Sequence, residues 1–161
     1  MTKIQKVSTS DVKQGRFRAH GLVEVTIDGN VARYEAWGPF NEELGTAFNA
    51  IQEQVLPEMA ALKRWGELTV FHVSMMASAS TLAKFTEALR VRAIQGLAPY
   101  ATAFVAGPEV EGAQLMGSLL AKFYADAGLL LMVFPRVTEA EAWLQSTLSA
   151  ANPAVHTDAA R

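Results

Sequence analysis

The feature that most constrains the fold is a regular alternation of helix-like and strand-like segments, which begins at the corner formed by residues 37–41. Pro39 cannot donate a hydrogen bond to a sheet, so the strand before it is expected to end there. Asn41 can cap a helix, and two glutamates follow where carboxylates favour the helix dipole. From this corner on, each helix pattern is followed by a strand pattern. Such alternation predicts a mainly parallel sheet covered by helices.

The segment before the corner predicts an antiparallel hairpin. Apolar and polar residues alternate over residues 17–28, as in a strand with one buried face. The sequence Asp28-Gly29-Asn30 is a turn signal, because glycine and asparagine adopt positive φ at little cost. A second strand is then expected over residues 31–37. The first strand should therefore be the antiparallel member of an otherwise parallel sheet.

Further helices and strands are predicted after the corner. The helices are expected over 42–62, 81–95, 111–127 and 138–149, and the strands over 68–73, 100–106 and 129–134. Pro57 should kink the first of these helices or divide it in two, while Thr138 and Glu141 form a capping box that should open the last. The strand over 129–134 is apolar throughout, which is typical of burial on both faces. The fold class is therefore α/β with a mixed sheet, in the order β-β-α-β-α-β-α-β-α.

The composition fits one globular domain. The chain has 161 residues, of which 50% are hydrophobic and 19% charged, so it can bury a sizeable core. We predict that the domain spans residues 16–149. Residues 1–15 and 150–161 lack hydrophobic periodicity, which predicts a mobile lead-in and a disordered tail.

Charge and residue usage exclude several classes of protein. The formal net charge is only −2, which argues against nucleic acid as the main partner. The chain contains no cysteine, so disulfides and cysteine nucleophiles are excluded. No secretory signal is visible, and no apolar run approaches the roughly 20 residues of a membrane span. A cytoplasmic protein that does not insert into a membrane is expected.

Candidate site residues lie in loops at the carboxyl ends of the predicted strands, where ligands usually bind to a parallel sheet. The residues considered for a partner or ligand surface are Trp37, Phe40, Ser74, Met75, Met76, Ser78 and Ser80. The competing interpretation is that these loops are ordinary connections, because a fold does not by itself imply a function.

Each candidate also has a purely structural interpretation. Ser78 and Ser80 could receive phosphate at a helix start, or could simply cap the helix. Met75 and Met76 cannot both point inward from an extended segment, so one could offer an adaptable apolar contact. Trp37 could stack on a ligand or belong to the core.

No catalytic constellation is visible. The chain has no G-x-S-x-G elbow, no Walker loop and no G-x-G-x-x-G motif. His72 lies among apolar residues, where a core or half-buried histidine is more common than a catalytic one. No pair of histidines or carboxylates has a spacing that predicts a metal site. We therefore predict a protein that is not an enzyme and uses no cofactor, and rank a hydrolase or transferase well below this.

Three segments together resemble a known family. They are the corner 36–43, the strand 68–73 that enters a serine-containing loop, and the segment 133–144 with its Trp-Leu pair. In their order and spacing they resemble the STAS domain family, specifically STAS/SEC14-like proteins similar to anti-sigma-factor antagonists. The resemblance covers roughly residues 16–149 and implies regulatory or binding work.

The resemblance also implies a position for a regulatory serine. In the best understood members, a serine at the start of the helix after the third strand is phosphorylated, and this controls binding to a partner kinase. Ser74, Ser78, Ser80 and Thr81 stand in this region here. Met75-Met76-Ala77 replaces the family's Asp-Ser-Ser-Gly run, so the phosphorylation switch is not transferred.

Two hypotheses about function follow. The first is a non-enzymatic regulatory or protein-interaction domain that signals through the loop after the third strand. The alternative is a small-molecule or lipid carrier with an apolar pocket between helices and sheet, suggested by the methionine pair, Trp37, Phe40 and Phe85. The expected partner is thus an unidentified protein or an apolar small molecule. An exposed edge strand would also offer a route to a homodimer.

Overall fold

The structure, a computed structural model, describes residues 6–13 and 15–150. Its strands are β1 (Lys6–Ser8), β2 (Leu22–Asp28), β3 (Val31–Trp37), β4 (Gly66–His72), β5 (Ala101–Val105) and β6 (Leu131–Phe134). Its helices are α1 (Glu42–Ala60), α2 (Ala79–Gln95), α3 (Ala113–Asp126), α4 (Val137–Ser149) and the short 3₁₀ helix η1 (Thr9–Asp11). The predicted α/β class is confirmed, and the predicted order of elements broadly fits.

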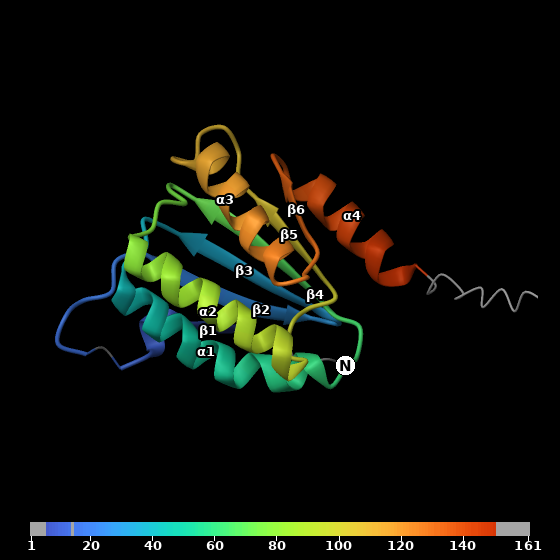
Figure 1. Ribbon diagram of the computed structural model, residues 1–161, viewed down its shortest axis with the longest axis horizontal. Helices are drawn as coiled ribbons and strands as arrows, with labels where there is room; N and C mark the ends of the chain where they lie inside the picture. The colour runs from blue at the N-terminus through green and yellow to red at the C-terminus, as the bar shows by residue number, and fades with distance from the viewer. Residues whose placement is uncertain (1–5, 14, 151–161) are drawn as a thin grey trace, which may run out of the picture.

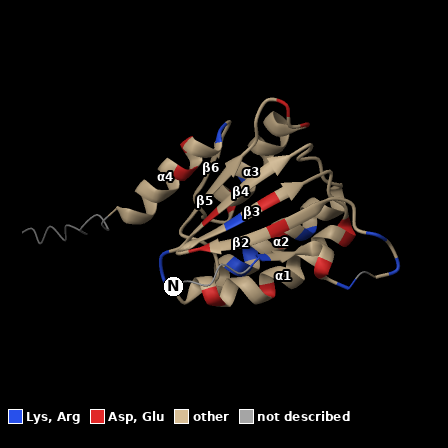
Figure 2. Cartoon of the chain, turned by 180° about the vertical axis from the view of Figure 1, so that it is seen from behind, with Lys and Arg blue, Asp and Glu red and all other residues tan. Residues whose placement is uncertain are grey.

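One mixed sheet forms the middle layer of the molecule. Its strands lie in the order β1-β2-β3-β4-β5-β6. β2 is antiparallel to both β1 and β3, whereas β3, β4, β5 and β6 run parallel to one another. Helices α1, α2 and α3 cover one face, and α4 packs on the other face over β4, β5 and β6 (Figure 1). The face of β2 and β3 opposite α1 carries charged residues, and none of the described helices covers it (Figure 2).

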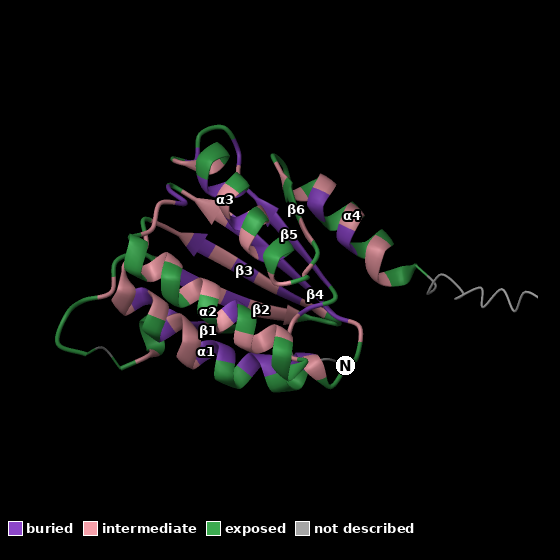
Figure 3. Cartoon of the chain, viewed as in Figure 1, coloured by how far each residue is buried: buried purple, intermediate pink, exposed green. Residues whose placement is uncertain are grey.

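Strand β4 separates two cores, because successive side chains of a strand point to opposite faces. Leu68 and Val70 belong to the core under α4, together with Leu144. Glu67, Thr69 and Phe71 alternate with them and face α1, α2 and α3. The buried residues of Figure 3 accordingly follow the strands and the inward sides of the helices.

Helix α1 begins as predicted and is not divided at Pro57. Asn41 Oδ1 accepts a hydrogen bond from the Leu44 N–H (3.1 Å), which confirms the expected N-cap. Pro57, expected to kink or divide this helix, lies inside one continuous helix that ends at Ala60. Only its last residues follow the proline, and they include Met59, which is buried in the core. This burial offsets part of the cost of the hydrogen bond that proline cannot make.

The N-terminal segment departs from the predicted lead-in over residues 1–15. Lys6–Ser8 pair with β2, and the Oγ1 of buried Thr9 accepts a hydrogen bond from the Val23 N–H (3.0 Å). The expectation of a lead-in without structure is therefore wrong for residues 6–13. A strand of three residues is too short to produce a recognisable periodicity. Residues 1–5 and 14 lie outside the described residues, as does the predicted tail beyond residue 150.

Strand β2 starts at Leu22 and not at residue 17. Gly21 precedes it with φ of +94°, a conformation that breaks an extended run. A Cβ at Gly21 would lie 2.7 Å from the Trp37 carbonyl oxygen, so the chain needs glycine at this close approach. Phe17, which the alternation placed on the buried face, is exposed.

Two predictions near the C-terminus are wrong. β6, expected to be buried on both faces, is the last strand of the sheet, and Met132 is 44% exposed. The capping box at Thr138 is absent, because α4 already starts at Val137 and has no side-chain hydrogen bond at its N-cap. Arg136 instead pairs with Glu139 in the first turn (2.7 Å). The remaining ends differ from expectation by a residue or two, as is usual for element boundaries.

The burial of α4 against the sheet predicts a difference between two leucines. Leu144 is 2% exposed and packs against β4 and β5, whereas Leu115 on α3 is 65% exposed. Leu144→Ala should lower the free energy of unfolding by about 2–5 kcal/mol, because it removes buried methyl groups and leaves a cavity. Leu115→Ala is the matched control and should change it by less than about 0.5 kcal/mol. Urea denaturation measures both, and equal effects would contradict this account of α4.

Candidate functional site

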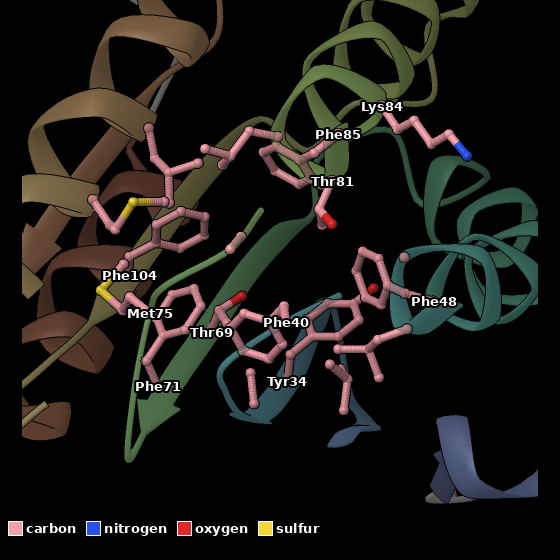
Figure 4. Close-up of a pocket in the computed structure, with 18 of the residues that line it drawn as sticks. Tyr34, Phe40, Phe48, Thr69, Phe71, Met75, Thr81, Lys84, Phe85 and Phe104 are labelled. Atoms are coloured by element: carbon pink, nitrogen blue, oxygen red, sulfur yellow. The ribbon is translucent and has the colours of Figure 1, made fainter. Parts of the chain in front are cut away.

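A pocket lies between the sheet and helices α1, α2 and α3. It has a volume of about 130 Å³, and most of its lining is apolar. Six aromatic side chains contribute to it: Tyr34, Phe40, Phe48, Phe71, Phe85 and Phe104 (Figure 4). Three of these rings come from strands, two from helices and one from the corner before α1. Residues far apart in the sequence therefore line one pocket.

The aromatic side chains around the pocket pack against one another. The ring of Phe71 meets that of Phe104 edge to face, with centroids 5.2 Å apart. Phe104 makes the same type of contact with Tyr124 at 5.5 Å, and Tyr34 does so with Phe48 at 5.7 Å. Edge-to-face pairs are a favoured geometry for aromatic rings. The pocket is thus supported by two sets of ring contacts, each of which joins a strand of the sheet to a helix.

Two loops close the carboxyl end of the pocket. The Phe40 N–H donates to the Met76 carbonyl (2.8 Å), and the Ser78 N–H donates to the Phe40 carbonyl (3.4 Å). A Cβ at Gly38 would lie 2.1 Å from the Ser74 carbonyl oxygen, so only glycine allows this approach. The corner and the loop after β4, both singled out from the sequence, therefore lie side by side.

The charged groups at the pocket differ in their access to solvent. Glu42 on α1 forms an ion pair with Lys84 on α2, and both side chains are substantially exposed. The hydrogen bond from Lys84 and its charge lower the pKa of Glu42. Lys84 extends away from the centre of the pocket in Figure 4. This pair therefore marks the solvent side, between α1 and α2.

Glu67 is the charged residue that lines the pocket from the sheet. It is 7% exposed and accepts a hydrogen bond from the Thr69 side chain. Among the residues described, no lysine, arginine or histidine forms a salt bridge with it. Burial raises the pKa of Glu67 from 4.5 to about 7, against the opposing charge of Arg92. Near neutral pH this carboxyl group is thus close to an even mixture of its acid and its anion.

Uncharged polar groups surround the same part of the sheet. The Tyr34 hydroxyl donates to Gln52 Oε1 (2.9 Å), and Gln52 Nε2 is buried without a hydrogen-bond partner among the residues that the structure describes. Burial raises the pKa of Tyr34 and of Tyr124 well above the ordinary value, and the nearby charge of Glu67 raises both further. Both phenols therefore stay neutral. The pocket has an apolar aromatic part and a polar part centred on Glu67.

Some of the site residues predicted from the sequence line the pocket, and others do not. Phe40 and Met75 line the pocket, and Met75 is buried. Trp37 does not line it, because it points to the opposite face of β3 from its neighbour Ala36. There Trp37 stacks on His72 with ring centroids 4.9 Å apart. His72 Nε2 in turn lies 2.6 Å from Glu35 Oε2, so the histidine is half-buried in a surface network.

The three candidate serines differ in their exposure to solvent. Ser74 is fully buried, and its Oγ accepts a hydrogen bond from the Met76 N–H (3.0 Å). Ser78 is the N-cap of α2, with its Oγ accepting from the Thr81 N–H (3.2 Å). Ser78 and Ser80 are both exposed. The capping interpretation thus holds for Ser78. Of the methionine pair, Met76 is only partly buried and lies beside the pocket.

Sequence reasoning missed Glu67, the most distinctive group of the site. The predicted strand began at residue 68, which left Glu67 in the preceding loop. A signal was present, since Glu67 and Thr69 alternate with Leu68 and Val70 and continue the row of Phe71. Placing a carboxylate within that alternation would have predicted a buried polar group facing the helices. No group of three potential metal-binding side chains occurs within residues 6–13 and 15–150.

Comparisons with protein-family models, with curated proteins and with solved structures found no match. The resemblance to STAS/SEC14-like proteins therefore stays a prediction. In the part of the chain that the structure describes, no helix has the length and apolar character to cross a bilayer.

The burial of Glu67 predicts a pH-dependent stability. The unfolded chain releases this proton near pH 4.5 but the folded protein only near pH 7. Between these values the folded state binds more protons, so the free energy of unfolding falls as pH rises and then levels off above pH 7. Relative to Glu67→Gln, which does not titrate, the wild type should lose about 3 kcal/mol over this range. Urea denaturation of both proteins between pH 4 and pH 8 measures the difference. A constant difference across this range would contradict the burial of Glu67 as a titrating group.

Proposed function

We propose that this protein binds a small apolar or aromatic molecule in the pocket between α1, α2, α3 and the sheet, and that it is not an enzyme. The observation that carries this proposal is the pocket itself, with six aromatic side chains around about 130 Å³. An engineered cavity of about 150 Å³ with an apolar lining binds benzene in another protein. The buried part of the ligand is therefore about the size of one aromatic ring with a short substituent.

The expected affinity is modest. Small ligands gain at most about 1.5 kcal/mol for each non-hydrogen atom, and most gain much less. A ligand of this size would thus bind with a dissociation constant on the order of 10 μM to 1 mM. This range suits a sensor or carrier of an abundant small molecule.

Filling the pocket should abolish binding. Gly45 on α1 lines the pocket, and a Cβ there would meet Thr81 Cγ2 at an ordinary contact distance of 3.8 Å. Gly45→Leu can therefore be accommodated by the backbone and would occupy the space of the ligand. Thr46→Leu adds the same side chain at the next, exposed position and is the control. Titration calorimetry with toluene and phenethyl alcohol should show at least ten-fold weaker binding to Gly45→Leu and unchanged binding to Thr46→Leu. Absence of binding to the wild type would contradict the proposal.

A second candidate function is a regulatory interaction at the start of α2. The observation that favours it is the exposure of Ser78 and Ser80 beside Ala77 and Thr81, which line the pocket. A partner protein or a phosphate at this position would therefore stand next to the ligand. This candidate keeps the regulatory role that the STAS resemblance implies.

The regulatory candidate predicts a pattern of phosphorylation. Mass spectrometry of the protein isolated from its own cells should find phosphate on Ser78 or Ser80 and none on Ser74, because Ser74 has no exposed surface. Ser78→Asp keeps an acceptor for the helix cap and should leave the melting temperature nearly unchanged. Complete absence of phosphate from Ser78 and Ser80 would contradict this candidate.

A further inference from the structure

We infer that the pocket selects a small aryl-alkyl amine, which binds as its cation with the ammonium group against the carboxylate of Glu67 and the ring among the aromatic side chains. This inference rests on the proposed function and names the class of ligand for the same pocket. The position of Glu67 in the pocket, the aromatic lining and the pairing of the nearby charges support it.

Glu67 lacks the partner that a buried carboxylate needs. Its side chain lines the pocket at 7% exposure, and it accepts a hydrogen bond from the neutral Thr69 side chain. Removing an anion from water is costly unless a cation or several donors replace the water. A ligand with an ammonium group would supply both the opposite charge and hydrogen-bond donors.

The other charges around Glu67 are already engaged or lie outside the pocket. Arg92 of α2 does not line it; its Nη2 lies 3.4 Å from Asn49 Oδ1 and its guanidinium stands over the Phe48 ring, 5.9 Å from the centroid. From β3 and α3 the titratable groups are the phenols of Tyr34 and Tyr124, which stay neutral. The side chains of α1 and β5 that face this region, Asn49, Gln52 and Thr102, carry no charge.

The ion pair of Glu42 and Lys84 at the solvent side also supplies no partner for Glu67. Glu42 and Lys84 neutralise one another there, so neither presents an unpaired charge to a ligand. Among the described residues that line the pocket, an incoming anion would meet the carboxylate of Glu67 and no unpaired cation, since Arg92 lies outside the lining. A neutral alcohol would leave that carboxylate without charge compensation.

The aromatic walls favour a cation as well as a ring. Aromatic faces attract ammonium groups, by roughly 0.5–2 kcal/mol depending on desolvation. Tyr34 lines the pocket from the strand next to β4, in direct register with Thr69 and close to Glu67. Phe71 lies further along β4 from Glu67, and the rings of Phe40 and Phe104 meet it there (Figure 4). Phenethylamine, a single ring with a two-carbon arm, matches both this arrangement and the volume.

The test compares three ligands that share the phenyl ring and differ in charge. Phenethylamine, phenethyl alcohol and phenylpropionate are titrated into the full-length protein by calorimetry at pH 6 and pH 8, at constant ionic strength. At pH 8 the amine should bind at least ten-fold more tightly than the alcohol, and phenylpropionate should bind most weakly. At pH 6 the amine should bind about ten-fold more weakly than at pH 8, because Glu67, with a pKa of about 7, is mostly protonated there.

Variants assign the preference to Glu67. Glu67→Gln should remove the preference for amine over alcohol and its pH dependence, while alcohol binding changes by less than about three-fold. Glu43→Gln removes the same charge from α1 outside the pocket and should keep both the preference and the pH dependence. Thermal unfolding of each variant confirms that it is folded.

The possible outcomes distinguish a failure of the amine assignment from a failure of ligand binding itself. Equal or tighter binding of the alcohol or of phenylpropionate, or a preference that survives Glu67→Gln, would overturn the assignment of an amine and leave ligand binding intact. Absence of binding by all three molecules would overturn the proposed function and this inference together.

Discussion

The pairing of β4 with a parallel neighbour on each side is the constraint on which the structure depends. It buries the strand and sends its alternate residues into two different layers. Leu68 and Val70 hold α4 on one face, while Glu67, Thr69 and Phe71 form part of the pocket on the other. A shift of one residue in this register would exchange these two sets. The same pairing that builds the core therefore also fixes the position of the buried carboxyl group.

Local chemistry accounts for what could be predicted from the sequence. Asn41 and Ser78 act at helix starts through contacts within a few residues, and the hairpin turn at residues 28–30 works in the same way. The errors concern features decided by distant partners. β6 is partly exposed because it is the last strand of the described sheet and pairs only with β5. The apolar sequence of β6 does not reveal this position at the edge.

The candidate site was predictable only in part. The two loops at the carboxyl end of the sheet were identified, and Phe40 and Met75 do line the pocket. Trp37 was misplaced because alternation along β3, and not proximity to the corner, decides which face it occupies. Glu67 was missed because a charged residue at the start of a strand looks like a loop residue until the neighbouring strands and helices enclose it.

The proposals for this protein depend on one property, the burial of the Glu67 carboxyl group in an aromatic pocket. Carbon-13 NMR of the glutamate side-chain carboxyl carbons, assigned with Glu67→Gln, measures its titration directly. The Glu67 signal is expected to titrate near pH 7 in the free protein, and phenethylamine is expected to lower this midpoint. Titration near the ordinary value of 4.5, unchanged by the amine, would contradict it.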